Sequence, residues 1–116
     1  MKPAISSFET ATRESDQRII ERIRQGDESA LVHLFHNNIL MVRKFVLENS
    51  GRSEDADDML QDALIVLWEN VVRGQFDLTS KISTYVYSVV RNKWLRELSK
   101  RKIGRVSSVD DHVLAE

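Results

Sequence analysis

The residues of this chain that could do chemistry are mostly charged, and they are divided by sign. Residues 73–106 contain nine Lys or Arg and two Asp or Glu, whereas the rest of the chain contains eight and sixteen. The net charge of −1 therefore hides a basic segment in an acidic chain. Residues 85–102 add tyrosine, asparagine and tryptophan to the cations. Cations bind phosphates, amides read base edges and rings stack on unpaired bases, so this segment indicates a nucleic-acid-binding surface.

The basic segment contains two kinds of candidate contact. Asn92 and Arg96 lie four positions apart, so on a helix they can point into one groove, the amide toward adenine or another mixed edge and the guanidinium toward guanine. The other cations suit phosphates, which position a protein without specifying sequence. They are Arg91, Lys93, Lys100, Arg101 and Lys102. The alternative is a solvated basic helix end that complements the helix dipole.

The acidic segment 54–62 requires a different partner, because carboxylates repel the phosphates of nucleic acid. Asp55, Asp58 and Asp62 are spaced i, i+3 and i+7, so on a helix they share one face and can meet one cationic groove. The expected partner is a basic protein surface. The alternative is that these acids only stabilise the N-terminus of their own helix.

Composition and motifs exclude several classes of protein. A chain of 116 residues can form one stable domain without disulfide bonds or a structural metal, and cysteine is absent. No apolar run approaches the roughly 20 residues of a membrane span, and the N-terminus lacks the apolar core of a secretory signal, so we expect a cytoplasmic protein. His33 and His36 could share a metal, but no third ligand lies near them in sequence. No catalytic motif emerges, so no enzyme and no cofactor are expected.

Apolar residues recur at three- and four-residue steps along most of the chain. This pattern predicts an all-α fold, a compact bundle of three or four helices. Residues 1–15 are polar and aperiodic, and we interpret them as a flexible arm. A first helix is expected to be capped by Asp16 and to stop at Gly26. Asp27 is expected to cap a second helix that ends near residues 49–51.

Ser53 is the expected cap of a third helix, whose acidic first turns suit the positive end of the helix dipole. After a break at residues 73–80, a fourth helix is expected to begin near residue 81 or 83 and to reach about residue 102, with Leu95 and Leu98 facing inward. The domain would thus cover residues 16–102, and residues 103–116 would form a linker. The expected core consists of Ile20, Ile23, Leu31, Leu34, Leu60, Leu64, Leu67, Val86, Val89 and Val90.

Residues 55–70 and 80–92 resemble a specific domain. Their sequences, DADDMLQDALIVLWEN and SKISTYVYSVVRN, are similar to the promoter-melting domain (domain 2) of bacterial sigma-70-family factors of the extracytoplasmic-function (ECF) type. Residues 19–31 fit the start of the same family. The resemblance covers about residues 16–102, and its motifs agree in order and spacing.

The resemblance implies two partners. In that family the helix that begins Asp-Ala-Asp-Asp binds an Arg-rich coiled coil of the RNA polymerase β′ subunit. The matching residues here are Asp55, Asp57, Asp58, Gln61 and Asp62. The second partner is the promoter −10 element, and the loop at residues 74–81 matches the segment that captures a base flipped out of it. Such factors are also commonly held inactive by an anti-sigma factor that covers the polymerase-binding face.

Backbone amides, Thr79, Ser80 and the rim of Phe76 could form the base pocket, unless Phe76 is tucked into the core. The full set of expected DNA contacts is Phe76, Thr79, Ser80, Lys81, Tyr85, Arg91, Asn92, Lys93, Arg96, Lys100, Arg101 and Lys102. Three residues depart from the family pattern, which often has Trp at Tyr85, an acid at Arg96 and a small residue at Trp94. Trp94 could stack on DNA, cover the domain edge or meet a partner.

Two functions stay open at this point. The first is a transcription initiation domain that binds core RNA polymerase and recognises and melts the −10 element. The second is a non-DNA-binding adaptor or decoy of the same fold that sequesters an anti-sigma factor or polymerase. Sigma factors of this type also carry a domain that reads the −35 element, and the chain ends where the linker to it would begin. We expect a fragment rather than a natural stand-alone protein.

Overall fold

Four helices make up residues 15–109, the part of the chain that the computed structural model describes, with side chains described for residues 15–102. They are α2 (Asp16–Arg24), α3 (Ser29–Glu48), α4 (Ser53–Val72) and α5 (Ile82–Val109). No strand occurs among these residues, so the predicted all-α fold is confirmed. The proposed flexible arm, apart from its last residue, and residues 110–116 of the proposed linker lie outside the described part.

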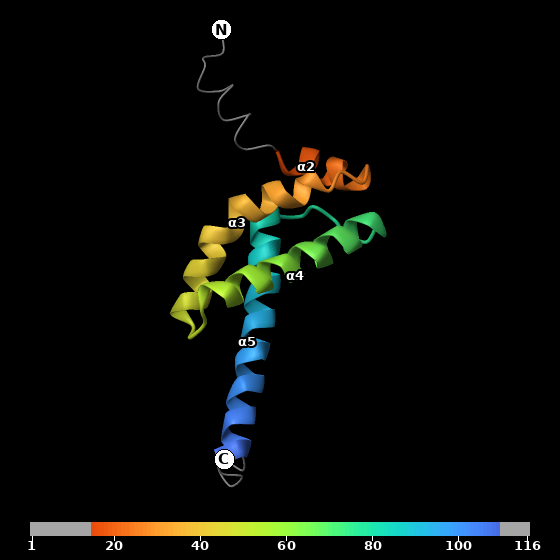
Figure 1. Cartoon of the computed structure of the whole chain (residues 1–116). Coiled ribbons are helices and arrows are strands. Elements are labelled where there is room, and N and C mark those ends of the chain that lie inside the picture. Colours follow the sequence, from red (N-terminus) through yellow and green to blue (C-terminus); the bar gives the residue numbers. More distant parts are fainter. Residues whose placement is uncertain (1–14, 110–116) are drawn as a thin grey trace.

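The helices α3 and α4 form the centre of the bundle and pack on each other more extensively than any other pair. Figure 1 shows α5 crossing both of them and α2 lying beside the start of α3. The helix α5 then projects beyond the ends of the other three helices. It continues to Val109, seven residues past its expected end at Lys102, so the proposed linker begins as helix.

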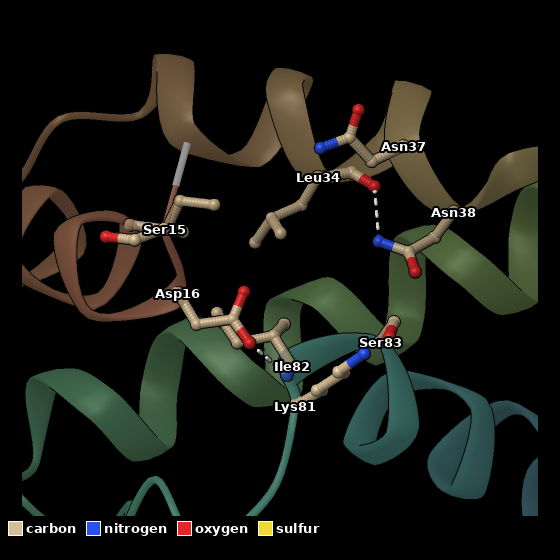
Figure 2. A pocket seen from close by; sticks show the side chains of 9 residues that line it. Ser15, Asp16, Leu34, Asn37, Asn38, Lys81, Ile82 and Ser83 are labelled. Carbon is tan, nitrogen blue, oxygen red and sulfur yellow. Dashed lines mark hydrogen bonds between the residues drawn. The ribbon is translucent and has the colours of Figure 1, made fainter. Parts of the chain in front are cut away.

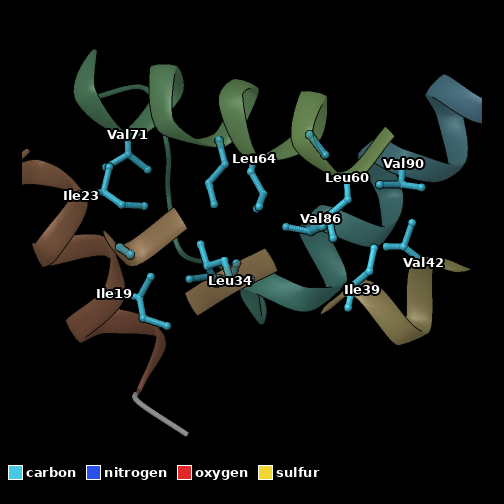
Figure 3. Close-up of a cluster of buried hydrophobic side chains, with 14 of the residues drawn as sticks. Ile19, Ile23, Leu34, Ile39, Val42, Leu60, Leu64, Val71, Val86 and Val90 are labelled. Atoms are coloured by element: carbon cyan, nitrogen blue, oxygen red, sulfur yellow. The ribbon is translucent and has the colours of Figure 1, made fainter. Parts of the chain in front are cut away.

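The core lies where all four helices face one another (Figure 3). Eight of the ten predicted core residues are buried, and the other two, Leu31 and Val89, are half-buried and pack against the cluster. Helical periodicity identified these residues because burial of an apolar stripe is what holds such helices together. Among the described residues, no helix is both long and apolar enough to cross a membrane.

The phase expected for α5 is wrong at one position. Leu95 was expected to face inward but is 37% exposed, whereas its neighbour Trp94 is fully buried. The buried row of α5 runs in steps of four through Ile82, Val86, Val90 and Trp94. Adjacent helical residues differ by about 100° in direction, so burial of the indole turns Leu95 toward solvent.

The connection between α3 and α4 explains how Trp94 is accommodated. The backbone at Ser50 takes the left-handed conformation, with φ of 73°, and ends the helix where a C-cap was expected. A Cβ atom on Gly51 would lie 2.6 Å from Cζ2 of Trp94 and would also collide with Val46. Glycine is therefore required at position 51 because the indole approaches the backbone there.

The helix starts differ from expectation by one residue. Ser15, not Asp16, caps α2, and its Oγ accepts a hydrogen bond from the Arg18 amide. The Asp16 carboxylate instead accepts a 2.8 Å hydrogen bond from the amide of Ile82, which ties α2 to the start of α5. Glu28, not Asp27, is the N-cap of α3, although the Asp27 carboxylate accepts a hydrogen bond from the Ser29 amide. Ser53 is the first residue of α4 rather than its cap.

Candidate nucleic-acid interface

The loop between α4 and α5 brings the predicted base-capturing residues to the surface. Gly74 adopts a φ of 72°, which turns the chain away from α4 after its last turn. Thr79, Ser80 and Lys81 are all exposed, and the Thr79 amide donates a 3.0 Å hydrogen bond to the Asp77 carbonyl. Two hydroxyl groups and one ammonium group therefore face solvent immediately before α5.

The two aromatic residues predicted at this loop contact each other. The rings of Phe76 and Tyr85 lie 5.0 Å apart, edge to face, and both residues are half-buried against the core. The Tyr85 hydroxyl accepts a 3.0 Å hydrogen bond from Asn70. Phe76 therefore takes the core-packing position that was the alternative to a pocket rim. An unpaired base could stack on these rings only at the parts left exposed.

A cavity of about 480 Å³ opens beside the start of α5 (Figure 2). Nine residues line it: Ser15, Asp16, Ile19, Leu34, Asn37, Asn38, Lys81, Ile82 and Ser83. Asn38 is only 3% exposed, and its side-chain amide donates a 2.8 Å hydrogen bond to the Leu34 carbonyl. In Figure 2 Asn38 on α3 and Ser83 on α5 lie on facing sides of the cavity.

Of the residues around this cavity, only Lys81 was predicted from the sequence as a DNA contact. The signal that could have revealed the others is the pair Asn37 and Asn38, which directly precedes the apolar run at residues 39–42 of α3. A buried amide is costly unless its polar atoms have partners, so an asparagine on a core-facing side often marks a polar site.

Among the basic residues of α5 up to residue 102, all but one lack a hydrogen-bond or ion-pair partner in the described part of the chain. Asn92 and Arg96 are both exposed and lie one helical turn apart, as predicted. Arg91, Lys100 and Lys102 are exposed and Lys93 is half-buried. None of these five cations forms an ion pair within the described residues, so their charges stay available for an anionic partner.

Arg101 is the exception. Its Nη2 lies 2.9 Å from Oδ1 of Asp55, and its Nε lies 3.0 Å from Oε2 of Glu97. The guanidinium also sits 4.9 Å from the ring centroid of Trp94, within the range of a cation–π contact. The sequence assigned Asp55 to a protein partner and Arg101 to DNA, but the structure joins them to each other.

The electrostatics of Asp55 follow from these contacts. The hydrogen bond from Arg101, and then that from the Arg52 amide at 2.9 Å, lower the pKa of Asp55 below its usual value. The Asp55 carboxylate thus accepts a capping hydrogen bond at the N-terminus of α4 and forms an ion pair with Arg101 of α5. Because these two residues lie 46 positions apart, local spacing could not have revealed the pair.

The other residues of α4 that were expected to bind polymerase fall into two groups. Asp57 is half-buried and pairs with Arg43 of α3 across 3.1 Å, a contact that the sequence did not reveal. Asp58, Gln61 and Asp62 are exposed and share one side of the helix. Their side chains have no hydrogen-bond or ion-pair partner among residues 15–102. They are therefore the members of the predicted acidic face that can bind another molecule.

Two grooves flank this exposed side of α4. A groove of about 420 Å³ between α3 and α4 is lined by Leu31, Val32, Phe35, Gln61, Leu64 and Ile65. It is mostly apolar, and Val32 and Ile65 are 58% and 51% exposed. A smaller groove of about 220 Å³ between α4 and α5 is lined by Met59, Asp62, Lys93, Arg96, Glu97 and Lys100. Gln61 thus borders the apolar groove and Asp62 the charged one.

Two further side chains were singled out from the sequence. His33 is half-buried with Nε2 3.1 Å from the Asn37 amide, and His36 is exposed with its ring edge-on to Phe35. No group of three or more potential metal ligands occurs among the described residues. Outside this histidine pair, Trp68 is half-buried and packs against the core.

Residues 34–103 match the model of the sigma-70 region 2 family, which is more than half of the chain. The chain belongs to the sigma-70 region 2 family. The resemblance noted in the sequence is thereby confirmed for a segment that begins within α3 and contains α4 and most of α5.

Two curated relatives of this region 2 domain are named as ECF factors. ECF RNA polymerase sigma factor SigM of Mycobacterium tuberculosis is 28% identical over 97 residues, which is 84% of this chain and 48% of SigM. ECF RNA polymerase sigma factor SigW of Bacillus subtilis is 27% identical over 86 residues, which is 72% of this chain and 43% of SigW. The chain thus spans about half the length of these relatives or less. No solved structure matches it.

Proposed function

We propose that this region 2 domain acts in bacterial transcription initiation, by binding core RNA polymerase and by recognising and melting the promoter −10 element. The observation that carries the proposal is a set of cations on α5 that have no ion-pair partner among residues 15–102: Arg91, Lys93, Arg96, Lys100 and Lys102. Like charges on one helix repel one another, and phosphates that bind them relieve this repulsion and release counterions. The names of the relatives, which are sigma factors, support the same assignment.

The DNA-binding part of the proposal assigns a separate role to each of three groups of residues. The cations of α5 bind phosphates, and Asn92 and Arg96 contact base edges. The exposed loop residues Thr79, Ser80 and Lys81 precede α5, and Lys81 lines the cavity beside it. This cavity offers amide and hydroxyl groups together with apolar side chains such as Ile19 and Leu34. A base that leaves the duplex loses its stacking, so a polar pocket that holds it lowers the cost of melting.

The polymerase-binding part is placed on the exposed side of α4. Asp55 and Asp57 are already paired with Arg101 and Arg43, so we assign the contact to Asp58, Gln61 and Asp62. Two carboxylates on the same side of α4 as Gln61, which borders the apolar groove, suit a partner helix with a basic edge and an apolar face. The expected partner is the Arg-rich coiled coil of the β′ subunit that the resemblance implies.

An anti-sigma factor that covers the same side of α4 is a further proposed partner, on the ground of the resemblance alone. The proposed site of action is the cytoplasm, where bacterial RNA polymerase works. Together with the polymerase and promoter contacts, these assignments describe a transcription factor and require no catalytic residue.

The test combines two binding steps. Core polymerase is first captured on the immobilised chain, and a labelled single-stranded oligonucleotide with a −10-like sequence is then added. The proposal predicts that polymerase is retained and that the oligonucleotide binds to the complex more tightly than to polymerase alone. Retention of polymerase without any gain in oligonucleotide binding would favour the decoy function instead. Failure to retain polymerase would contradict the proposal.

A further inference from the structure

We propose that Arg101 is a positioning residue, which fastens the basic half of α5 to α4 through Asp55 and Trp94 and does not itself bind phosphate. This inference rests on the proposed function, because it concerns how α5 presents its other cations to DNA. The sequence suggested that Arg101 contacts DNA and that Asp55 contacts polymerase. The proposal instead gives both residues a structural role, in which they hold α5 against α4.

The first argument is that two carboxylates already bind the guanidinium group of Arg101. Arginine binds a phosphate best through two parallel N–H groups, of which Nε and one Nη form one such pair. In Arg101 the Nε contacts Glu97 and the Nη2 contacts Asp55, so this edge is already used by carboxylates. A phosphate at that edge would have to displace both acids.

The second argument is the fixed platform beneath the guanidinium. Trp94 is fully buried, and its indole N–H donates a 2.9 Å hydrogen bond to the carbonyl of Asn49. Gly51 leaves the room that this ring needs. The indole therefore cannot move without disturbing the connection between α3 and α4. A contact to its face fixes Arg101 relative to that connection.

The third argument is the place of the contact along α5. Figure 1 shows α5 projecting beyond the bundle, and among the described side chains the pair of Asp55 and Arg101 is the last hydrogen bond and ion pair between α5 and another helix. Lys100 and Lys102 flank this contact, are exposed and have no partner within residues 15–102. The positions of Lys100 and Lys102 relative to the loop at residues 74–81 therefore depend on whether α5 is held at residue 101.

The competing assignment predicts an opposite result for one substitution. If Arg101 binds phosphate and Asp55 merely restrains it, Asp55→Asn frees a cation and removes a negative charge, so DNA binding becomes tighter. If Arg101 positions α5, Asp55→Asn loosens the helix and DNA binding becomes weaker. Glu54→Gln is the matched control, because Glu54 lies in the same first turn of α4, is exposed and has no described partner.

The binding experiment uses the complex of the chain with core polymerase and the labelled single-stranded −10-like oligonucleotide over a series of salt concentrations. We expect Asp55→Asn and Arg101→Gln each to weaken binding severalfold while leaving the slope of log affinity against log salt unchanged. Lys100→Gln should make that slope shallower by about 0.7, since it removes one phosphate contact. Tighter binding of Asp55→Asn, or a shallower slope for Arg101→Gln, would overturn the inference.

A second experiment needs no DNA and so separates failure of this inference from failure of the proposed function. The chain contains no cysteine, so spin labels can be attached to Glu69→Cys on α4 and Lys102→Cys on α5 without further changes. We expect a narrow distance distribution between the labels, which broadens in Arg101→Gln and in Asp55→Asn but not in Glu54→Gln. A distribution that Arg101→Gln leaves unchanged would overturn the positioning role even if the domain binds DNA. Absence of DNA binding by the unmodified chain would instead contradict the proposed function.

Discussion

The indole N–H of Trp94 donates a 2.9 Å hydrogen bond to the backbone carbonyl of Asn49, and this bond fixes α5 to the connection between α3 and α4. The ring is completely buried, and Gly51 provides the space against which it packs. Trp94 is therefore a structural anchor in the middle of a helix whose sequence contains seven Lys or Arg. Of the three roles left open for it by the sequence, the structure supports the one that covers the edge of the domain.

Removal of this hydrogen bond should destabilise the fold. Trp94→Phe keeps an aromatic ring but leaves the Asn49 carbonyl without its donor, and we expect a loss of about 1–3 kcal/mol in the free energy of unfolding. Trp68→Phe is the matched control, because the side chain of Trp68 is half-buried and has no described hydrogen bond. Urea unfolding followed by circular dichroism measures both changes. Equal losses for the two variants would show that the bond to Asn49 does not matter.

The burial of α4 and α5 predicts unequal costs for similar truncations. Leu64→Ala removes a buried side chain from the centre of the core and should cost about 2–5 kcal/mol. Leu95→Ala removes a side chain that faces solvent and should change stability by no more than about 0.5 kcal/mol. The same unfolding assay compares them. A large loss for Leu95→Ala would mean that the helix phase derived from Trp94 is incorrect.

The low pKa of Asp55 predicts how stability depends on pH. Arg101, and then the Arg52 amide, stabilise the charged form of Asp55 only in the folded state. The contribution is therefore present above the pKa of an unfolded Asp and is lost as the pH falls through the lower pKa of the folded state. We expect the urea midpoint to fall on acidification from about pH 6 to about pH 3, and to fall less in Asp55→Asn. Identical pH profiles for the unmodified chain and for Asp55→Asn would contradict the ion pair between Asp55 and Arg101.

Reversal of charge on α4 should abolish binding to polymerase without unfolding the domain. Asp58→Lys with Asp62→Lys places like charges against a basic partner, and both side chains are exposed and unpaired among the described residues. Glu28→Lys with Glu48→Lys makes the same change in net charge elsewhere and should leave binding intact. Binding to core polymerase is measured by pull-down, with circular dichroism as a check of helicity. Undiminished binding by the first double variant would move the interface away from this side of α4.

Most of the fold was predictable because helix burial leaves a local pattern. Residues such as Leu60, Leu64 and Leu67 recur at the spacing of one helix face, and their burial needed no knowledge of the partner helices. Trp94 and Leu95 are neighbours, and only the helix that each one meets decides which is buried. Local periodicity could not make that choice.

The candidate site was predictable only in part, since its contacts join distant positions. The exposed acids and cations were found from composition and spacing, and Asn92 and Arg96 do share a side of α5. The pairs Asp55 with Arg101, Asp57 with Arg43 and Asp16 with the Ile82 amide link residues that are far apart in sequence. No local rule identifies such partners. For this reason Asp55 and Arg101 were each assigned to a separate surface.

The most direct test of the proposed function is sequence-selective capture of single-stranded DNA by core polymerase loaded with this chain. The measurement is the ratio of affinities for a −10-like oligonucleotide and for a scrambled oligonucleotide of the same composition. We predict a clear preference for the −10-like strand and affinities that fall steeply with salt. Asn92→Ala should reduce the preference by a factor that corresponds to about 1–3 kcal/mol while leaving the salt dependence unchanged. Equal affinities for the two strands, with or without Asn92, would contradict a role for this domain in recognising the −10 element.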